Sequence, residues 1–545
     1  MRKKLLLTFM LLGCTAVAQH FRFAQLTDIH LNSKLPERKE QLAESIQRIN
    51  SLDSLDFVLI TGDISDDGDR PAMMEVKRSI DRLRVPYYIV MGNHETKWSD
   101  SGCMAWKDIF GYERFEFEYQ GVHFLGFNTG PLMRMAYGHV VAQDLAWLKE
   151  RLDSYPKDEP VIIVTHYPLL KGDVDNWYEV TDLLRHYNVR LCIGGHYHSM
   201  CNHSYDGIPG VLLRSNIREH DTGTGFGLYE VTRDSISLTV MNSLTPPARF
   251  ASYAMRGPIR DKDGLVLDPD AGAREYPDSS DNVTYSQVER VWLHHSGVSV
   301  YSSPAVEGKR VFVGDDAGCV TAYRLRDGKS LWRFQTGARI IGTPAASNGV
   351  LVVPSADGCI YGLKTSSGRQ VWKVQTDAPV LGAVAIRDGI AYVGGSDHCM
   401  RALDVRSGRV CWTYSGVEGY IESAASGFLA GVELARRLGR EADAEKYSAL
   451  AADVKEKCES VLCDGGWYIR GITADNRKIG TQTDEEGRVH MESNTWAVLS
   501  GAAARERGIK AMDSVDDYLY TDFGLMLNAP CYTKPDDGIG FVTRV

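Results

Sequence analysis

The chain has 545 residues, of which 43% are hydrophobic, 24% charged and 10% aromatic. This composition is that of a folded protein, and it excludes a disordered chain, a collagen-like fibre and a polytopic membrane protein. The length predicts roughly three or four domains. The formal net charge is −10, so we do not expect nucleic acid to be a main partner.

Residues 1–18 predict a signal for export. A basic start precedes the apolar run 5–17, and Ala16-Val17-Ala18 is a small-residue cleavage pattern. The run is too short to span a bilayer, and we expect no transmembrane span elsewhere. The protein is therefore expected to be periplasmic or secreted. Leu11-Leu12-Gly13-Cys14 resembles a bacterial lipobox, which leaves a second possibility, a lipoprotein anchored through Cys14.

Residues 21–243 alternate strand and helix patterns. Amphipathic segments at 39–51 and 74–83 separate the early strands, which favours βαβ units and a mainly parallel sheet. The later segments 225–232 and 235–241 resemble strands with no helix between them, so we expect the sheet to close with antiparallel pairs. The other predicted strands are 21–26, 57–61, 86–91, 122–127, 161–165 and 190–193.

Five short polar motifs follow predicted strands in this region. They are Asp28-Ile29-His30, Gly62-Asp63, Gly92-Asn93-His94-Glu95, His166 and Gly195-His196-Tyr197-His198. Ligands bind at the strand ends of open α/β sheets. The mixture of His, Asp and Asn suits Mn, Fe, Zn or Ni better than Ca. A purely structural role is a poor explanation, because so many buried polar groups would need partners at once.

In this order the motifs resemble the calcineurin-like metallophosphoesterase family over about 21–240. The resemblance implies a sandwich of α/β/β/α layers that holds two divalent transition metal ions. It also implies that His94 is not a ligand but a catalytic residue, which stabilises a phosphoryl oxygen or protonates the leaving group. Glu95 replaces the commoner Asp and is expected to orient His94 from the second shell. By motif, Asp28, His30 and His198 hold one ion, Asn93, His166 and His196 hold the other, and Asp63 bridges them.

The resemblance implies an exported phosphoesterase that uses a two-metal hydroxide mechanism. The motifs offer no activated Ser or Cys, so we expect no covalent intermediate. The substrate is expected to be a small phosphoester or a component of the envelope. Phosphodiesters and phosphomonoesters both remain open.

Residues 244–285 have little periodicity and include Pro246-Pro247, which predicts a linker. A repeat follows over 286–420, in which one tryptophan and one glycine each recur every 40 residues. Four-stranded units of this length are typical of β-propeller blades. The recurring residues are Trp292, Trp332, Trp372 and Trp412, with Gly328, Gly368 and Gly408.

This repeat resembles propellers of the pyrroloquinoline-quinone (PQQ) type. Three blades form an incomplete ring, because propellers have about 4–8. The units lack the vicinal cysteines and catalytic acids of quinone-dependent dehydrogenases, so we expect a scaffold without PQQ. Propellers of this type also occur as noncatalytic envelope proteins. The alternative function is therefore an exported binding or assembly protein in which the propeller is the working part.

Residues 422–545 carry helical spacing at 427–438 and 442–461 and predict an all-α part. The segments 467–471, 484–488, 496–501 and 532–535 resemble the interior of the (α/α)-barrel of glycoside phosphorylases that act on cellobiose-like disaccharides. The matching segment lacks that family's catalytic Asp and phosphate loops, so we expect no phosphorylase activity. Two origins remain open, a fused or misassembled reading frame and a divergent helical appendage.

Overall fold

A computed structural model describes the residues from His20 onward, with gaps. The predicted export signal, Cys14, the helix at 427–438 and most of the helix at 442–461 lie outside the described residues. The chain forms two compact units, Met1–Glu422 and Ser423–Val545, which we describe separately. The described residues are 20–132, 135–273, 275–278, 290–415, 445, 448, 452, 455–456, 458–472, 477–499, 503–521, 524–526 and 528–532.

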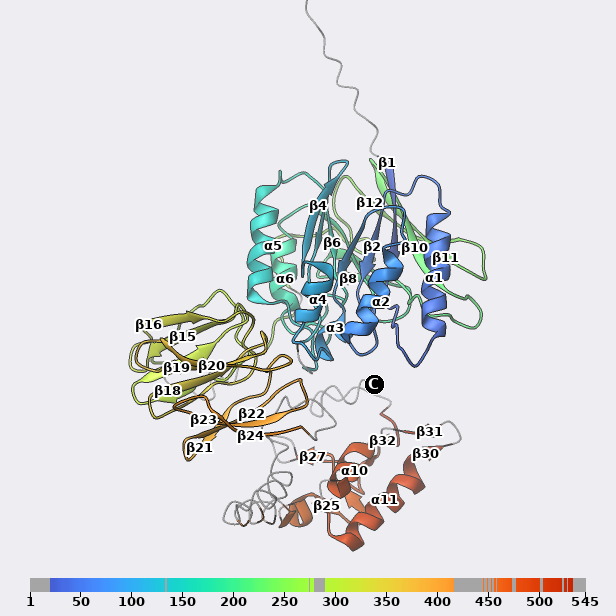
Figure 1. Cartoon of the computed structure of the whole chain (residues 1–545). Coiled ribbons are helices and arrows are strands. Elements are labelled where there is room, and N and C mark those ends of the chain that lie inside the picture. The colour runs from blue at the N-terminus through green and yellow to red at the C-terminus, as the bar shows by residue number, and fades with distance from the viewer. Residues whose placement is uncertain are drawn as a thin grey trace, which may run out of the picture. The chain divides into compact units, whose positions relative to one another are not determined.

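Two six-stranded sheets form the first part of unit 1 (Figure 1). The first sheet has the order β12-β11-β10-β1-β2-β3, in which β1 to β3 are parallel and β10 to β12 add antiparallel strands. The predicted parallel core and antiparallel closure are therefore both present. The strands are β1 His20–Leu26, β2 Phe57–Thr61, β3 Tyr87–Val90, β10 Gly225–Thr232, β11 Ser235–Asn242 and β12 Ala248–Ala254.

The second sheet has the order β4-β5-β6-β7-β9-β8. Its central strands β5, β6, β7 and β9 run parallel, and β4 and β8 form antiparallel edges. The strands are β4 Phe115–Tyr119, β5 Val122–Gly126, β6 Val161–Val164, β7 Val189–Gly194, β8 Cys201–Tyr205 and β9 Ile208–Leu212.

Three hydrophobic clusters hold the four predicted α/β/β/α layers together, and each lies between two neighbouring layers. The middle cluster joins the two sheets through aromatic rings, with Phe23 stacked on Tyr229 at 4.5 Å and in edge contact with Phe124. One outer cluster packs α1 (Glu37–Asn50), α2 (Arg70–Ile80) and α4 (Met104–Phe110) on the first sheet. The other packs α5 (Ala142–Ser154) and α6 (Trp177–Leu184) on the second. Burial of these faces places both sets of strand ends around one site.

The predicted linker begins too early. Residues 248–254 form β12, which pairs antiparallel with β11 and extends the first sheet. Every residue of β12 is at least partly exposed. An edge strand of this kind carries no alternating hydrophobic pattern, which is why the sequence did not predict it.

The repeat region forms three four-stranded antiparallel sheets, as predicted. The Trp332 indole donates a 2.9 Å hydrogen bond to Thr365 O of the next unit, and its ring lies 2.5 Å from where a Cβ on Gly368 would stand. Gly368 also has φ +71°, so both packing and backbone explain the recurring glycine. Of these three sheets, the first consists of β13 Ala305–Glu307, β14 Arg310–Gly314, β15 Cys319–Arg324 and β16 Ser330–Gln335. The second consists of β17 Ala345–Ser347, β18 Val350–Pro354, β19 Cys359–Lys364 and β20 Gln370–Gln375. The third consists of β21 Ala385–Arg387, β22 Ile390–Gly394, β23 Met400–Asp404 and β24 Val410–Tyr414.

Unit 2 combines helices with short strands, which corrects the expectation of an all-α part. Its described residues include α10 (Met491–Leu499), α11 (Arg505–Leu519), a π-helix at Cys458–Leu462 and four two-stranded sheets. Strands of two residues are too short to show a periodicity. They are β25 Cys463–Asp464, β26 Trp467–Tyr468, β27 Gly471–Ile472, β28 Lys478–Ile479, β29 Val489–His490, β30 Tyr520–Thr521, β31 Gly524–Leu525 and β32 Asn528–Ala529.

Among the described helices of the chain, none has the length and apolar character that crossing a membrane requires.

Candidate metal centre

The strand ends of both sheets meet at one cluster of polar side chains. Asp28, Asp63, His166 and His196 each lie two residues beyond the end of a parallel strand, namely β1, β2, β6 and β7. Asn93 and His94 begin the short helix α3 (Asn93–Lys97) after β3. Each residue predicted to bind metal lies in this cluster, because parallel strands present their carboxyl ends at the same edge of a sheet.

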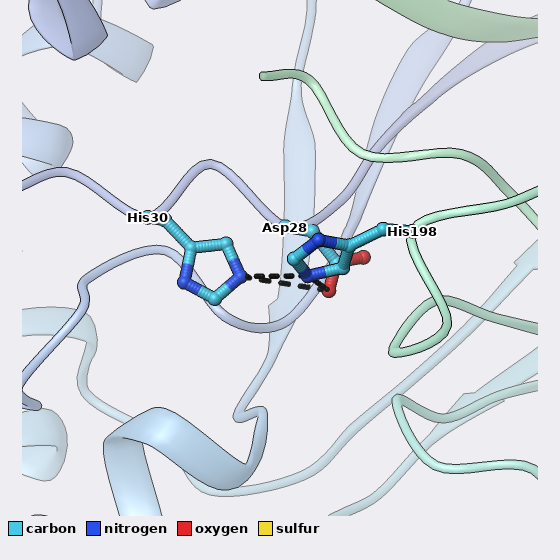
Figure 2. Close-up of side chains that lie close together, drawn as sticks. All are labelled: Asp28, His30 and His198. Atoms are coloured by element: carbon cyan, nitrogen blue, oxygen red, sulfur yellow. Dashed lines mark hydrogen bonds and ion pairs between the residues drawn. The ribbon is translucent and has the colours of Figure 1, made fainter. Parts of the chain in front are cut away.

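The first group of donors consists of Asp28, His30 and His198 (Figure 2). The two imidazole Nε2 atoms are 3.0 Å apart. Asp28 Oδ1 lies 3.2 Å from His198 Nε2 and 3.8 Å from His30 Nε2. Asp28 and His30 are buried, whereas His198 lies at the rim. Three donor atoms thus converge on one point.

The second group consists of Asp63, His166 and His196. Asp63 Oδ2 is 3.1 Å from His166 Nε2, and Asn93 Oδ1 is also 3.1 Å from that nitrogen. The same Asp63 oxygen lies 3.8 Å from His30 Nε2 in the first group. One carboxylate is therefore within reach of both groups.

The backbone of this centre is strained. Asp28, His30, Asp63, His196 and His198 all have φ between 49° and 80°. Residues other than glycine rarely adopt this left-handed region, and its cost is of the order of 1–3 kcal/mol for each residue. Five such residues in one cluster indicate that the fold holds them in place for a function.

Two glycines make room for the centre. Gly62 has φ +87°, and a Cβ there would lie 2.6 Å from Gly92 N. A Cβ on Gly92 would lie only 2.1 Å from Asp63 Oδ1. Both motifs require glycine because the loops after β2 and β3 lie so close together that a Cβ atom does not fit between them.

Hydrogen bonds set the tautomers of two histidines. His166 Nδ1 lies 2.6 Å from the carbonyl oxygen of Thr61, which can only accept, so this nitrogen carries the proton. His30 Nδ1 bonds at 2.8 Å to the carboxylate of Asp66. Both Nε2 atoms are then free to bind a metal ion. Asp66 is not among the site residues predicted from the sequence, although its position three residues after Asp63 was a usable signal.

His94 is oriented by Asp66 rather than by Glu95. His94 Nδ1 bonds to the Asp66 carbonyl oxygen at 2.5 Å, and its backbone N–H donates to Asp63 Oδ1 at 2.9 Å. The buried Glu95 carboxylate instead accepts from Gly92 N at 2.9 Å and from both N and Oγ of Ser65 at 3.0 Å. Glu95 therefore fastens the loop after β2 to the start of α3, which corrects its expected role.

Burial and neighbouring charges shift the pKa values of the donors in both directions. Burial lowers the pKa of His166, but the charge and hydrogen bond of Asp63 outweigh it and raise the pKa to about 9. Burial raises the pKa of Asp63, but the charge and hydrogen bond of His166 outweigh it and hold the pKa below its usual range. Burial and the charge of His166 lower the pKa of His196 to about 3. An ionised carboxylate and a neutral imidazole are the forms that bind metal.

Three protein-family models match consecutive stretches of the chain. Residues 21–200 match the calcineurin-like phosphoesterases, 283–418 match the outer membrane protein assembly factor BamB, and 398–545 match the catalytic domain of the glycosyl hydrolase 94 superfamily. These matches confirm the three resemblances. In sequence, residues 21–200 are thus similar to the calcineurin-like phosphoesterases, and the sandwich fold and strand-end donors lie in the same part of the chain.

Individual relatives match separate parts of the chain. A probable glycerophosphodiester phosphodiesterase of Arcobacter nitrofigilis is 29% identical over 199 residues, which cover 32% of this chain and 70% of that protein. An N,N'-diacetylchitobiose phosphorylase of Vibrio proteolyticus is 56% identical over 116 residues. Those residues cover 21% of this chain and 14% of that enzyme, so the chain spans a small share of it.

Among solved structures, BamB from Moraxella catarrhalis is 23% identical and has a TM-score of 0.22. The match covers 23% of this chain and 42% of that one.

Proposed function

We propose that the N-terminal domain hydrolyses phosphoric esters with the help of two divalent transition metal ions, which are Mn, Fe, Zn or Ni. The observation that carries this proposal is the position of Asp63 Oδ2, within 3.8 Å of a nitrogen in each donor group. A carboxylate within reach of two groups of imidazole nitrogens suits a bridging ligand.

The donor set fits two ions. Asp28, His30 and His198 would hold one, Asn93, His166 and His196 the other, and Asp63 would bind both. Two ions held by these residues would activate water and would neutralise charge on the attacking and leaving oxygens of a phosphoryl group. The nitrogen and oxygen donors agree with a transition metal rather than Ca.

The chain's own residues would supply the proton. The Asp66 carbonyl holds His94 Nδ1, which leaves Nε2 directed to the centre, 3.9 Å from Asp63 Oδ2. The His94 side chain is 27% exposed, so a substrate can reach it. As an imidazolium, His94 would donate its Nε2 proton to the leaving oxygen or hold a phosphoryl oxygen.

Phosphodiesters are the substrate class that the relatives favour. Besides the glycerophosphodiester phosphodiesterase, a 3',5'-cyclic-nucleotide phosphodiesterase of Nostoc is 27% identical over 195 residues. We propose a small phosphodiester as the first choice and a phosphomonoester as the second. We also propose export, so that the substrate would be outside the cytoplasm.

The test combines metal analysis with a substrate panel. The full chain is purified, its metals are counted by elemental analysis, and it is assayed with Mn²⁺ on bis-p-nitrophenyl phosphate, p-nitrophenyl phosphate and cyclic nucleotides. About two ions per chain and turnover of the diester support the proposal. Absence of both bound metal and turnover would favour the binding or assembly function of the repeat region.

A further inference from the structure

The half-buried His196 differs from the buried His30 and His166 in how its ring is held. His30 and His166 each bond through Nδ1 to an oxygen. Within the described part of the chain, no hydrogen bond reaches the ring of His196. The ring is instead packed against Tyr167, with centroids 3.9 Å apart. Packing limits rotation of the ring but does not choose which nitrogen carries the proton.

The Asp173 carboxylate faces the Nε2 atom of this ring. Asp173 Oδ1 lies 4.0 Å from His196 Nε2, and its side chain is 15% exposed. Its other oxygen, Oδ2, accepts a 2.7 Å hydrogen bond from the hydroxyl of Tyr197, the residue between the two histidines of the motif. The carboxylate is thus tied to the same loop that carries His196.

The backbone also holds Asp173 in place. Its N–H donates to Leu170 O at 3.1 Å, and its carbonyl accepts from Gly138 N at 2.7 Å. One carboxylate oxygen is occupied by Tyr197, so Oδ1 is the oxygen available to His196. A shift of about 1 Å brings Oδ1 and Nε2 to hydrogen-bond distance.

We propose that Asp173 is a positioning residue for the second metal ion. It accepts a hydrogen bond from His196 Nε2–H and thereby leaves the Nδ1 lone pair for the ion beside Asp63 and His166. Carboxylate–histidine–metal triads of this kind fix the tautomer and raise the basicity of the ligand. This inference rests on the proposed function, because it assumes that the centre binds metal.

The experiment compares Asp173→Asn with a matched control in the same loop, Asp175→Asn. Asp175 pairs with His139 at 2.7 Å and lies outside the donor groups. Mn²⁺ is titrated into the metal-free full chain, and both dissociation constants are measured against a competing chelator. Asp173→Asn should weaken one of the two sites by about 10–100-fold and leave the other unchanged. Asp175→Asn should match the wild type.

Two further variants keep the inference falsifiable if Asp173→Asn folds poorly. Tyr197→Phe releases the carboxylate without removing it and should weaken the same site by a smaller factor. Asp173→Glu keeps an acceptor and should recover part of the affinity that Asn loses. Wild-type affinity in both Asp173→Asn and Tyr197→Phe would overturn the inference. Failure of the wild type to bind two ions would instead overturn the proposed function.

Discussion

Asp63 Oδ2 lies 3.1 Å from His166 Nε2, although the two residues follow strands of different sheets. Asp63 lies two residues after β2 of the first sheet, and His166 lies two residues after β6 of the second. The contact therefore depends on how the two sheets pack, and the aromatic cluster between them sets that packing. The centre exists only when the whole sandwich is folded.

His94→Ala should separate catalysis from metal binding. The ring is outside both groups that we propose as ligand sets, so metal content should stay near that of the wild type. Turnover of bis-p-nitrophenyl phosphate should fall by roughly two to four orders of magnitude, the usual contribution of a positioned acid. His123→Ala is the control, since His123 pairs with Glu159 outside the centre. Full turnover by His94→Ala would show that its assigned role is wrong.

Gly92→Ala should disrupt the centre by steric contact alone. The new Cβ would stand 2.1 Å from Asp63 Oδ1, so the carboxylate or the loop must move. We expect at least one ion to be lost, as measured by elemental analysis. Gly471→Ala is a suitable control, because a Cβ there meets no atom within 4 Å. Two tightly bound ions in Gly92→Ala would contradict this account of the glycine.

Asp144 should make stability depend on pH. Burial raises the pKa of Asp144 from 3.8 to about 6, although Arg114 opposes the shift. At pH values between these two pKa values, Asp144 keeps its proton in the folded state and loses it in the unfolded chain. The free energy of unfolding therefore falls as the pH rises, by up to about 3 kcal/mol.

Asp144→Asn lacks this dependence. The stability of the wild type relative to Asp144→Asn should therefore decrease from pH 4 to pH 7. The measurement is the thermal unfolding midpoint of unit 1 in both proteins at both pH values. An equal difference at the two pH values would show that burial does not raise this pKa.

The sequence predicted most of the centre because its residues occur in short motifs next to strong strand patterns. The positive φ angles of Asp28 and Asp63 could not be predicted from these motifs, because backbone strain depends on the loops that surround a residue. The role of Glu95 was misjudged because its partners, Gly92 N and Ser65, include backbone groups that only the folded loop brings near. β12 and the short strands of unit 2 escaped prediction because edge and two-residue strands carry too little pattern.

The most direct test of the account is the metal content of Asp63→Ala. Because one Asp63 oxygen lies within 3.8 Å of donor nitrogens in both groups, its removal should cost both ions together with phosphodiester turnover. Elemental analysis of the purified full chain should find about two ions in the wild type and close to none in the variant. Retention of both ions by Asp63→Ala would contradict a bridging role for this carboxylate, and with it the two-metal centre proposed here.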